Sequence, residues 1–173
     1  MPDFLVIGYH GRKSEGNADR KLIMGKSSNV LIREMHIPCI IIKRALNPEK
    51  ISYVITVDGT QRSRDSVNIF LLLVQANDAL TILHVEEVDK SNESGLLDTK
   101  QFYEGVLKRI NRSEGGYVSL LSGDKSVIDC ISEYVDQEDP DFLCLSPSQS
   151  RTVDSVTETL LVRTNSNVIL YKI

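Results

Sequence analysis

Short apolar runs alternate with amphipathic segments through most of the chain, and this alternation constrains the fold more than any other feature of the sequence. Apolar runs bounded by turn residues are typical of buried strands, and apolar residues at helical spacing are typical of helices. After residue 50, the expected strands cover residues 51–57, 79–85, 117–121, 141–145 and 168–173. The expected helices between them cover residues 63–77, 98–113, 126–136 and 153–163, with Gly115 and Gly116 ending the second helix.

Strands that alternate with helices pair in parallel, because each crossover helix returns the chain to the same edge of the sheet. The pattern therefore predicts an α/β domain over residues 51–173. We expect a doubly wound, five-stranded parallel sheet with the strand order 3-2-1-4-5.

Residues 1–43 carry a shorter strand–helix–strand pattern of their own. An apolar run at 4–7 leads into Gly8 and Gly11, and a second apolar run at 37–42 closes the segment. Gly8 and Gly11 would lie at the carboxyl end of a strand, which is where parallel sheets bind ligands. Glycine lets backbone N–H groups approach an anion closely, and a following helix N-terminus attracts negative charge.

This arrangement resembles the end of a universal stress protein domain, in which a strand is followed by Gly-x2-Gly, a spacer, Gly-Ser or Gly-Thr, a helix and a last strand. Here Gly8 and Gly11 are followed by thirteen residues and then by Gly25, Lys26 and Ser27, so the spacer is longer than in the family. The ending HIPCIIIKR is also similar to the family's final strand.

The resemblance covers residues 51–173 in order and length, from an opening strand that ends in Asp58-Gly59-Thr60. The first segment repeats only the last part of that domain, because DFLVIGYHG matches DFLCLSPSQ and IIIKR matches ILYKI. The chain therefore resembles a tandem universal stress protein with an incomplete first domain at 1–43, a linker at 44–50 and a complete second domain at 51–173. This implies the fold described as adenine nucleotide alpha hydrolase-like.

The resemblance implies a non-catalytic module that binds an adenine nucleotide, ATP with Mg²⁺ as an accompanying ion, and that serves in a stress response. The family's aspartate contact with the nucleoside would fall on Asp58. The phosphates would lie on the glycine loop, with Lys26 adding charge; this loop carries over to Gly8, Gly11, Gly25 and Ser27. The second copy departs from the pattern, because residues 146–149 read Ser-Pro-Ser-Gln and proline has no N–H to donate.

Several alternatives remain open. Asp58 is also a typical turn residue before a helix, so its role can be structural. The chain can be a degenerate dimerisation or protein-interaction module without a nucleotide. Slow ATP hydrolysis is a third reading, for which the sequence offers no catalytic residue. His84, inside the strand at 79–85, is expected to be structural.

The N-terminal segment also predicts how the chain assembles. The strand at 4–7 would leave a bare sheet edge, so another copy of the chain is the expected cover and a homodimer is expected. The last strand of the segment, 38–43, should pair antiparallel with residues 168–173. In a rival arrangement, residues 1–43 would supply the two strands beside residues 51–57 and displace 141–173.

Composition excludes several classes of protein. The chain has 173 residues, 41% of them hydrophobic and 25% charged, which is ordinary for a globular protein. It shows no signal-peptide pattern and no apolar run of membrane-spanning length, so we expect a cytoplasmic protein with no membrane contact. Its basic residues are scattered without interleaved aromatics, so no nucleic-acid partner is expected. Its three cysteines show no metal-binding spacing.

Overall fold

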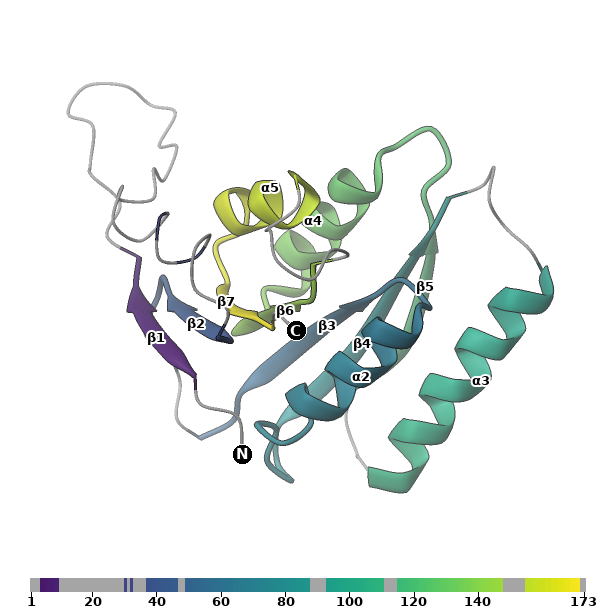
Figure 1. Ribbon diagram of the computed structural model, residues 1–173, viewed down its shortest axis with the longest axis horizontal. Coiled ribbons are helices and arrows are strands. Elements are labelled where there is room, and N and C mark those ends of the chain that lie inside the picture. Colours follow the sequence, from purple (N-terminus) through teal and green to yellow (C-terminus); the bar gives the residue numbers. More distant parts are fainter. Residues whose placement is uncertain are drawn as a thin grey trace.

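Seven strands form one sheet in the computed structural model of the chain (Figure 1). The structure describes residues 4–9, 30, 32, 37–46, 49–87, 93–110, 115–147 and 155–171. The strands in chain order are β1 (Leu5–Gly8), β2 (Cys39–Ile42), β3 (Ser52–Val57), β4 (Ala79–Glu86), β5 (Gly115–Leu121), β6 (Phe142–Leu145) and β7 (Asn167–Leu170). Across the sheet they lie in the order β1-β2-β7-β6-β3-β4-β5.

Five neighbouring strands are parallel to one another, in the order β7-β6-β3-β4-β5. Numbered within residues 51–173, their order is 3-2-1-4-5, so the predicted doubly wound domain is confirmed. β3 lies at its centre because both neighbours bond to it: Ser52 is in register with Ala79 of β4, and Tyr53 with Phe142 of β6.

The N-terminal strands extend this sheet. β1 and β2 are parallel to each other, and β2 pairs antiparallel with β7, with Cys39 opposite Leu170 and Ile41 opposite Val168. The predicted antiparallel pairing of the two final strands is therefore confirmed. The rival arrangement is wrong, because β6 and not β1 occupies the place beside β3.

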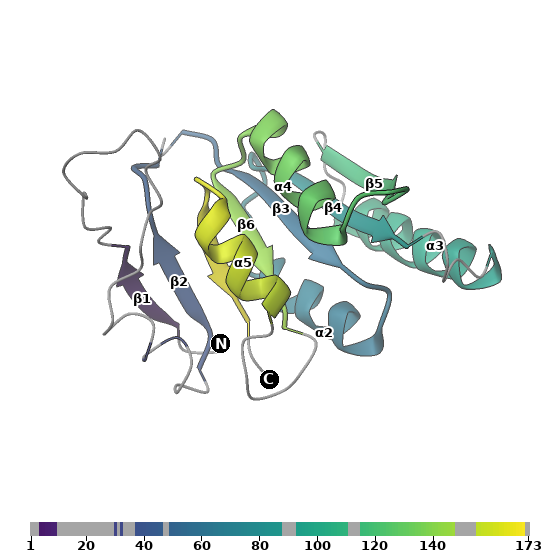
Figure 2. The same ribbon diagram turned by 90° about the horizontal axis from the view of Figure 1, so that it is seen from above.

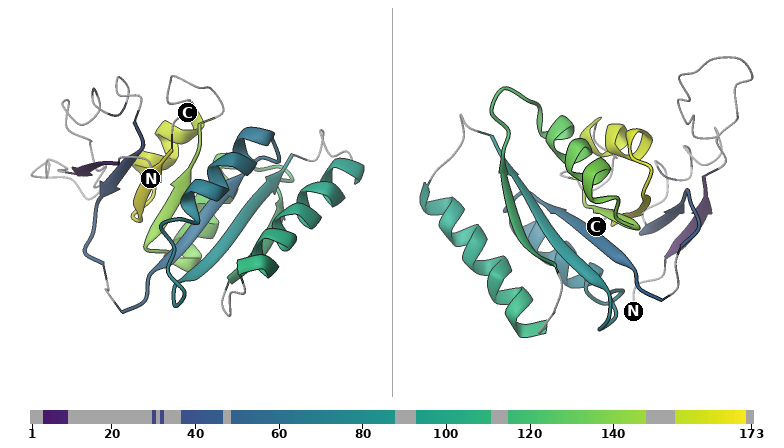
Figure 3. Two further views of the ribbon diagram at one scale, coloured as in Figure 1. Left: turned by 60° about the horizontal axis from the view of Figure 1, so that its bottom comes forward. Right: turned by 180° about the vertical axis from the view of Figure 1, so that it is seen from behind.

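Helices cover both faces of the sheet. They are α2 (Gln61–Phe70), α3 (Glu93–Ile110), α4 (Val127–Glu138) and α5 (Ser155–Arg163). α2 and α3 lie on one face, and α4 and α5 lie on the other (Figures 2 and 3). Each pair of helices closes its own apolar core, one around Val67, Phe70 and Tyr103, the other around Ile131 and Leu160.

The central strands are mostly apolar because both of their faces are buried. In β3, Val54 points into the core under α4 and α5, whereas Tyr53 and Ile55 point into the core under α2 and α3. The N-terminal strands join the same layers, since Ile7 and Ile41 belong to the core under α4 and α5. The continuous apolar runs of the sequence therefore correspond to strands covered on two sides.

Hydrogen bonds from Lys43 and Arg44 stabilise the junction between β2 and β7. The backbone N–H groups of Lys43 and Arg44 donate to Oδ1 of Asn167 at 2.7 and 3.0 Å. Nζ of Lys43 donates to the carbonyl oxygens of Leu161 and Thr164 at the end of α5, at 2.5 and 2.7 Å. These bonds supply partners to carbonyls that a helix end would otherwise leave unsatisfied, so the side chain of Lys43 caps α5.

Three predicted boundaries differ from the structure. α2 ends at Phe70 rather than at residue 77, because the Asp78 carboxylate accepts from the N–H groups of Gln75 and Ile51 and holds a turn there. α3 begins at Glu93, inside a stretch expected to be a loop. The pair Gly115 and Gly116 was expected to end a helix but begins β5.

Candidate functional site

A cavity of about 730 Å³ opens at the carboxyl ends of β3, β4 and β6. From β3 the chain proceeds to β4 on one side, whereas β6 lies on the other side, so the cavity lies where the strand order reverses. Open α/β sheets bind their ligands at this topological switch point. The volume is within the range of small-molecule sites.

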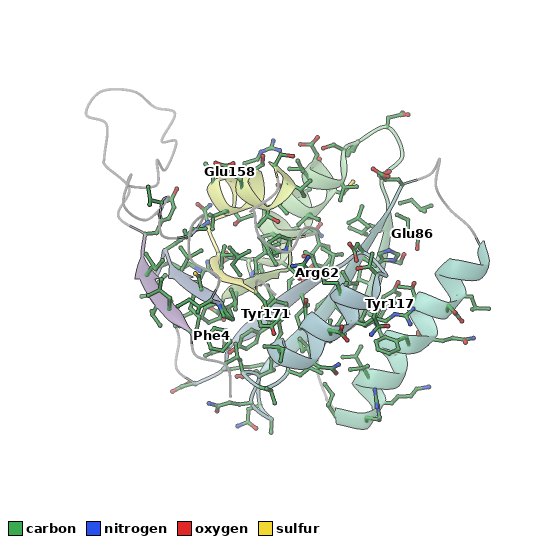
Figure 4. The ribbon with its side chains drawn as sticks, in the orientation of Figure 1. Phe4, Arg62, Glu86, Tyr117, Glu158 and Tyr171 are labelled. Atoms are coloured by element: carbon green, nitrogen blue, oxygen red, sulfur yellow. The ribbon has the colours of Figure 1, made fainter. Side chains whose placement is uncertain are left out.

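The cavity has one polar wall and one apolar wall. The polar wall comes from the β3–α2 turn, the end of β4 and the start of α3; its charged residues are Asp58, Arg62, Arg64, Glu86, Glu87 and Asp98. The apolar wall comes from the end of β6 and from α4 and α5, and it includes Val127, Ile131, Leu145, Val156 and Leu160. Figure 4 labels Arg62 and Glu86, which come from α2 and β4. Such a pair of walls suits a ligand with a flat apolar part and a polar part.

Asp58 is the first residue after β3 and lines the cavity. Its Oδ1 accepts from the N–H and the hydroxyl of Thr60, at 3.0 and 2.7 Å, and Thr60 in turn caps α2 by accepting from the N–H of Ser63. Asp58 therefore holds the turn before α2, as the structural interpretation expected, but the cap of the helix is Thr60 and not Asp58. Among the described residues no donor reaches its second oxygen, Oδ2, so the carboxylate still has an acceptor to offer to a ligand.

Gly59 keeps this turn close to α3. Its φ is +78°, a conformation that L side chains rarely adopt, and a Cβ at this position would lie 3.0 Å from Oγ1 of Thr99. The glycine therefore lets the β3–α2 turn approach α3 and form one side of the cavity.

His84 lies in the floor of the cavity and is 7% exposed. Its Nδ1 is 3.0 Å from the hydroxyl of Tyr117 on β5 and 3.7 Å from Oε1 of Glu86, which also accepts from Ser119 at 2.5 Å. Burial lowers the pKa of His84 below 6.5, and this outweighs the opposing charges of Glu86 and Asp58. His84 is therefore neutral at pH 7. Its contact with Tyr117 agrees with the predicted structural role, although its ring also lines the cavity.

The end of β6 differs from a glycine loop in structure as well as in sequence. The Ser66 hydroxyl donates to Oγ of Ser146 at 2.7 Å, so Ser146 is held against α2. Pro147, which is buried, follows it and lines the cavity. A proline at this position offers no backbone N–H to an anion.

Of the predicted N-terminal loop residues, the structure describes Gly8, which does not line the cavity. Gly8 is the last residue of β1, at a carboxyl strand end as expected. Gly11, Gly25, Lys26 and Ser27 lie outside the described residues, so their role stays a prediction. Because β2 is antiparallel to β7, β1 and β3 run in opposite directions, with three strands between them. Their carboxyl ends therefore lie on opposite sides of the sheet, at opposite ends of the strands. Gly8 and Asp58 therefore do not form one site within a single chain.

Several cavity residues were not singled out from the sequence. Glu86 and Glu87 directly follow an apolar strand, and polar residues at the end of a buried strand are a signal that was available. Arg62 and Asp98 carry no such signal, because their position depends on how α2 and α3 pack at the mouth of the cavity.

No group of three or more His, Cys, Asp or Glu side chains among the described residues is placed to hold a metal ion. No helix in the part of the chain that the structure describes is long and apolar enough to cross a membrane.

No protein-family model matches the chain, and no curated protein matches its sequence significantly. Solved structures do match. A universal stress protein from Archaeoglobus fulgidus DSM 4304 superposes with a TM-score of 0.70 and 15% identity, covering 98% of this chain and 60% of its own. A protein from Pseudomonas aeruginosa UCBPP-PA14, provisionally named a universal stress protein, has a TM-score of 0.68 and 12% identity, covering 98% of this chain and 63% of its own.

The chain has the fold of the universal stress proteins. A shorter universal stress protein from Archaeoglobus fulgidus, solved in complex with dAMP, has a TM-score of 0.56 and 16% identity, covering 70% of this chain and 98% of its own. The universal stress protein resemblance is thus confirmed at the level of the fold. This chain spans about 60% of the longer universal stress protein structure from Archaeoglobus fulgidus.

Proposed function

We propose that the chain is an adenine-nucleotide-binding module of the universal stress protein type, and that the cavity beside β3 holds the adenosine part of the ligand. The observation that carries the proposal is a cavity of about 730 Å³ at the switch point of the sheet, with the carboxylate of Asp58 at its edge. A universal stress protein of the same fold was solved in complex with dAMP, which supports this ligand class.

The two walls suit the two parts of adenosine. The apolar wall of α4 and α5 offers aliphatic side chains against which a flat base can pack, and burial of such surface drives binding. The polar wall offers carboxylate oxygens to the hydroxyl and amino groups of the ligand, which are hydrogen-bond donors. Oδ2 of Asp58 is the acceptor at the edge of this wall, because Oδ1 is already engaged by Thr60.

The resemblance further implies ATP with Mg²⁺, binding without catalysis, and a role in a stress response. These points rest on the resemblance alone, and the proposal for the cavity does not depend on them. Mg²⁺ prefers to bind through one or two carboxylates together with substrate phosphates, so it would arrive with the nucleotide rather than occupy a separate site.

Isothermal titration calorimetry of the full chain with adenine ligands tests the proposal, with Asp58→Ala as the variant. We expect its affinity to fall at least tenfold, about 1.4 kcal/mol, because the apposed hydroxyl or amino donor loses its acceptor. Thr60→Ala is the matched control, since it weakens the same turn and the same helix start but retains the carboxylate. It should lose much less affinity than Asp58→Ala.

Equal losses in the two variants would mean that Asp58 acts only through the fold of the turn. An absence of binding by the parent chain to any adenine ligand would sink the proposal. Mass spectrometry of the purified, denatured protein provides a second readout, because a tightly bound adenine nucleotide can co-purify.

A dimerisation or protein-interaction module is the second candidate function. The observation that favours it is β1, an apolar strand at one edge of the sheet in which Val6 is 63% exposed. Exposed strand edges pair readily with other chains. This function requires no ligand, so it predicts self-association or partner binding that is indifferent to adenine compounds.

A further inference from the structure

The charge around the cavity disfavours a polyanion. Among the described residues, its charged lining comprises the carboxylates of Asp58, Glu86, Glu87 and Asp98 and two guanidinium groups, those of Arg62 and Arg64. The Arg64 guanidinium already lies 4.6 Å from the ring centroid of Phe102 on α3. His84 adds no positive charge, because burial holds its pKa below 6.5. A phosphate chain in this cavity would therefore meet an excess of negative charge.

The chain segments that follow β4 and β6 carry no net charge in sequence. Residues 88–92 and 148–154, which follow β4 and β6, lie outside the described residues. Their charged residues are Asp89, Lys90, Arg151 and Asp154, so the two positive charges are matched by two negative ones. In sequence these segments therefore add no net charge to the four carboxylates and two guanidinium groups of the described lining.

The described end of β6, up to Pro147, also lacks the groups that bind phosphate. Anion sites on α/β sheets use backbone N–H groups of a loop that glycine lets approach closely. Here the hydroxyl of Ser146 is bonded to Ser66, and buried Pro147 presents a ring without an N–H. Beyond Pro147, the next part of the cavity wall that the structure describes is the apolar surface of Val156 and Leu160 on α5. This side of the cavity suits an uncharged ring rather than a phosphate.

We infer that the cavity selects for an adenine ligand without a phosphate chain, so that its affinity follows the order adenosine, then AMP, then ATP. This inference rests on the proposed function, because it specifies the ligand class of the same cavity. It is carried by the excess of carboxylates in the lining and by Pro147 at the end of β6.

The experiment is calorimetric titration of the full chain at pH 7.5 with adenosine, AMP and ATP, the last with and without Mg²⁺. We expect adenosine to bind about tenfold more tightly than ATP, and AMP to fall between them. Affinity for ATP equal to or greater than that for adenosine would overturn the inference and leave the proposed function standing. No binding by any of the three would overturn the proposed function, and the inference with it.

A charge variant tests the physical cause. Asp98→Asn removes one carboxylate charge from the mouth of the cavity and should raise the ratio of ATP affinity to adenosine affinity about threefold. Asp124→Asn is the control, because Asp124 is exposed, follows β5 and does not line the cavity. The same change in ratio from both variants, or no change from Asp98→Asn, would contradict the electrostatic argument.

Discussion

Gly115 shows how the conformation of one residue can determine where a strand begins. Its φ is +99°, which side-chain-bearing residues rarely adopt, and a Cβ here would lie 1.6 Å from the carbonyl oxygen of Leu80 on β4. The adjacent Gly116 has open space around the position of a Cβ. From sequence alone the pair indicates only a break between elements. In the structure, β5 requires a glycine at position 115 but not at position 116.

Gly115→Ala should therefore lower the free energy of unfolding by about 3 kcal/mol, since β4 and β5 must separate or the backbone must change. Gly116→Ala should change it by less than about 0.5 kcal/mol. Urea unfolding of both variants measures the difference. Similar values for the two would show that the start of β5 is not held against β4 as described.

Residue positions in the candidate site were only partly predictable from sequence. Asp58 could be found because it directly follows a strong apolar strand and precedes a glycine. Arg62 and Asp98 could not, because each lies in a helix whose sequence pattern reports only its buried face. What brings them to one cavity is the packing of α2 and α3 on the sheet, for which the local sequence has no signature.

At the scale of elements, the strands were predictable and the helix ends were less so. β3 and β6 are recognisable because burial on both faces leaves them mostly apolar. The end of α2 was placed too late because the apolar spacing continues to Val74, which is buried, while the chain already turns. The turn depends on side-chain bonds to Asp78, and hydrophobic spacing does not report such bonds.

The lysine that caps α5 makes the junction between β2 and β7 sensitive to pH. Burial lowers the pKa of Lys43 from 10.5 to about 8. Between pH 8 and 10.5 the unfolded chain therefore binds more protons at this residue than the folded chain, so the free energy of unfolding rises with pH in that window. Below pH 8 the residue is protonated in both states and contributes no slope.

Lys43→Met should remove this contribution. We expect the difference in free energy of unfolding, parent minus variant, to grow by on the order of 1 kcal/mol between pH 7.5 and 9.5. Denaturant melts at the two pH values measure it, and taking the difference cancels the other titrating groups. A difference that stays constant with pH would mean that Lys43 keeps an ordinary pKa in the folded chain.

At the scale of the whole molecule, the seven-stranded sheet has two exposed edge strands. β1 forms one edge and β5 the other, and each exposes a large apolar side chain, Val6 at 63% and Leu121 at 69%. The strand order and the antiparallel junction at this scale were predictable, because the sequence repeats its final strand–helix–strand pattern and so offers two equivalent final strands that can pair with each other. Because of that junction, Gly8 and the cavity beside β3 lie at opposite ends of the strands.

We expect the chain to self-associate through β1, and Val6→Lys to shift the mass measured by light scattering at micromolar concentration from dimer toward monomer. A lysine on an edge strand opposes pairing with another chain. Leu121→Lys on β5 is the matched control and should leave the mass unchanged. A parent chain that is monomeric throughout, or a control that dissociates equally, would contradict association through β1.

The pairing of β2 with β7 also sets an order of events during synthesis. β2 ends at Ile42, whereas its partner begins at Asn167, so well over a hundred residues are translated between the two halves of the junction. At about 5–20 residues per second, this interval lasts roughly 6 to 25 seconds. Throughout it, the apolar strands made first have no β7 against which to pair. The ribosome-bound chain is therefore most vulnerable to aggregation and to holdase chaperones through its earliest strands, and it becomes protected only when its last strand emerges.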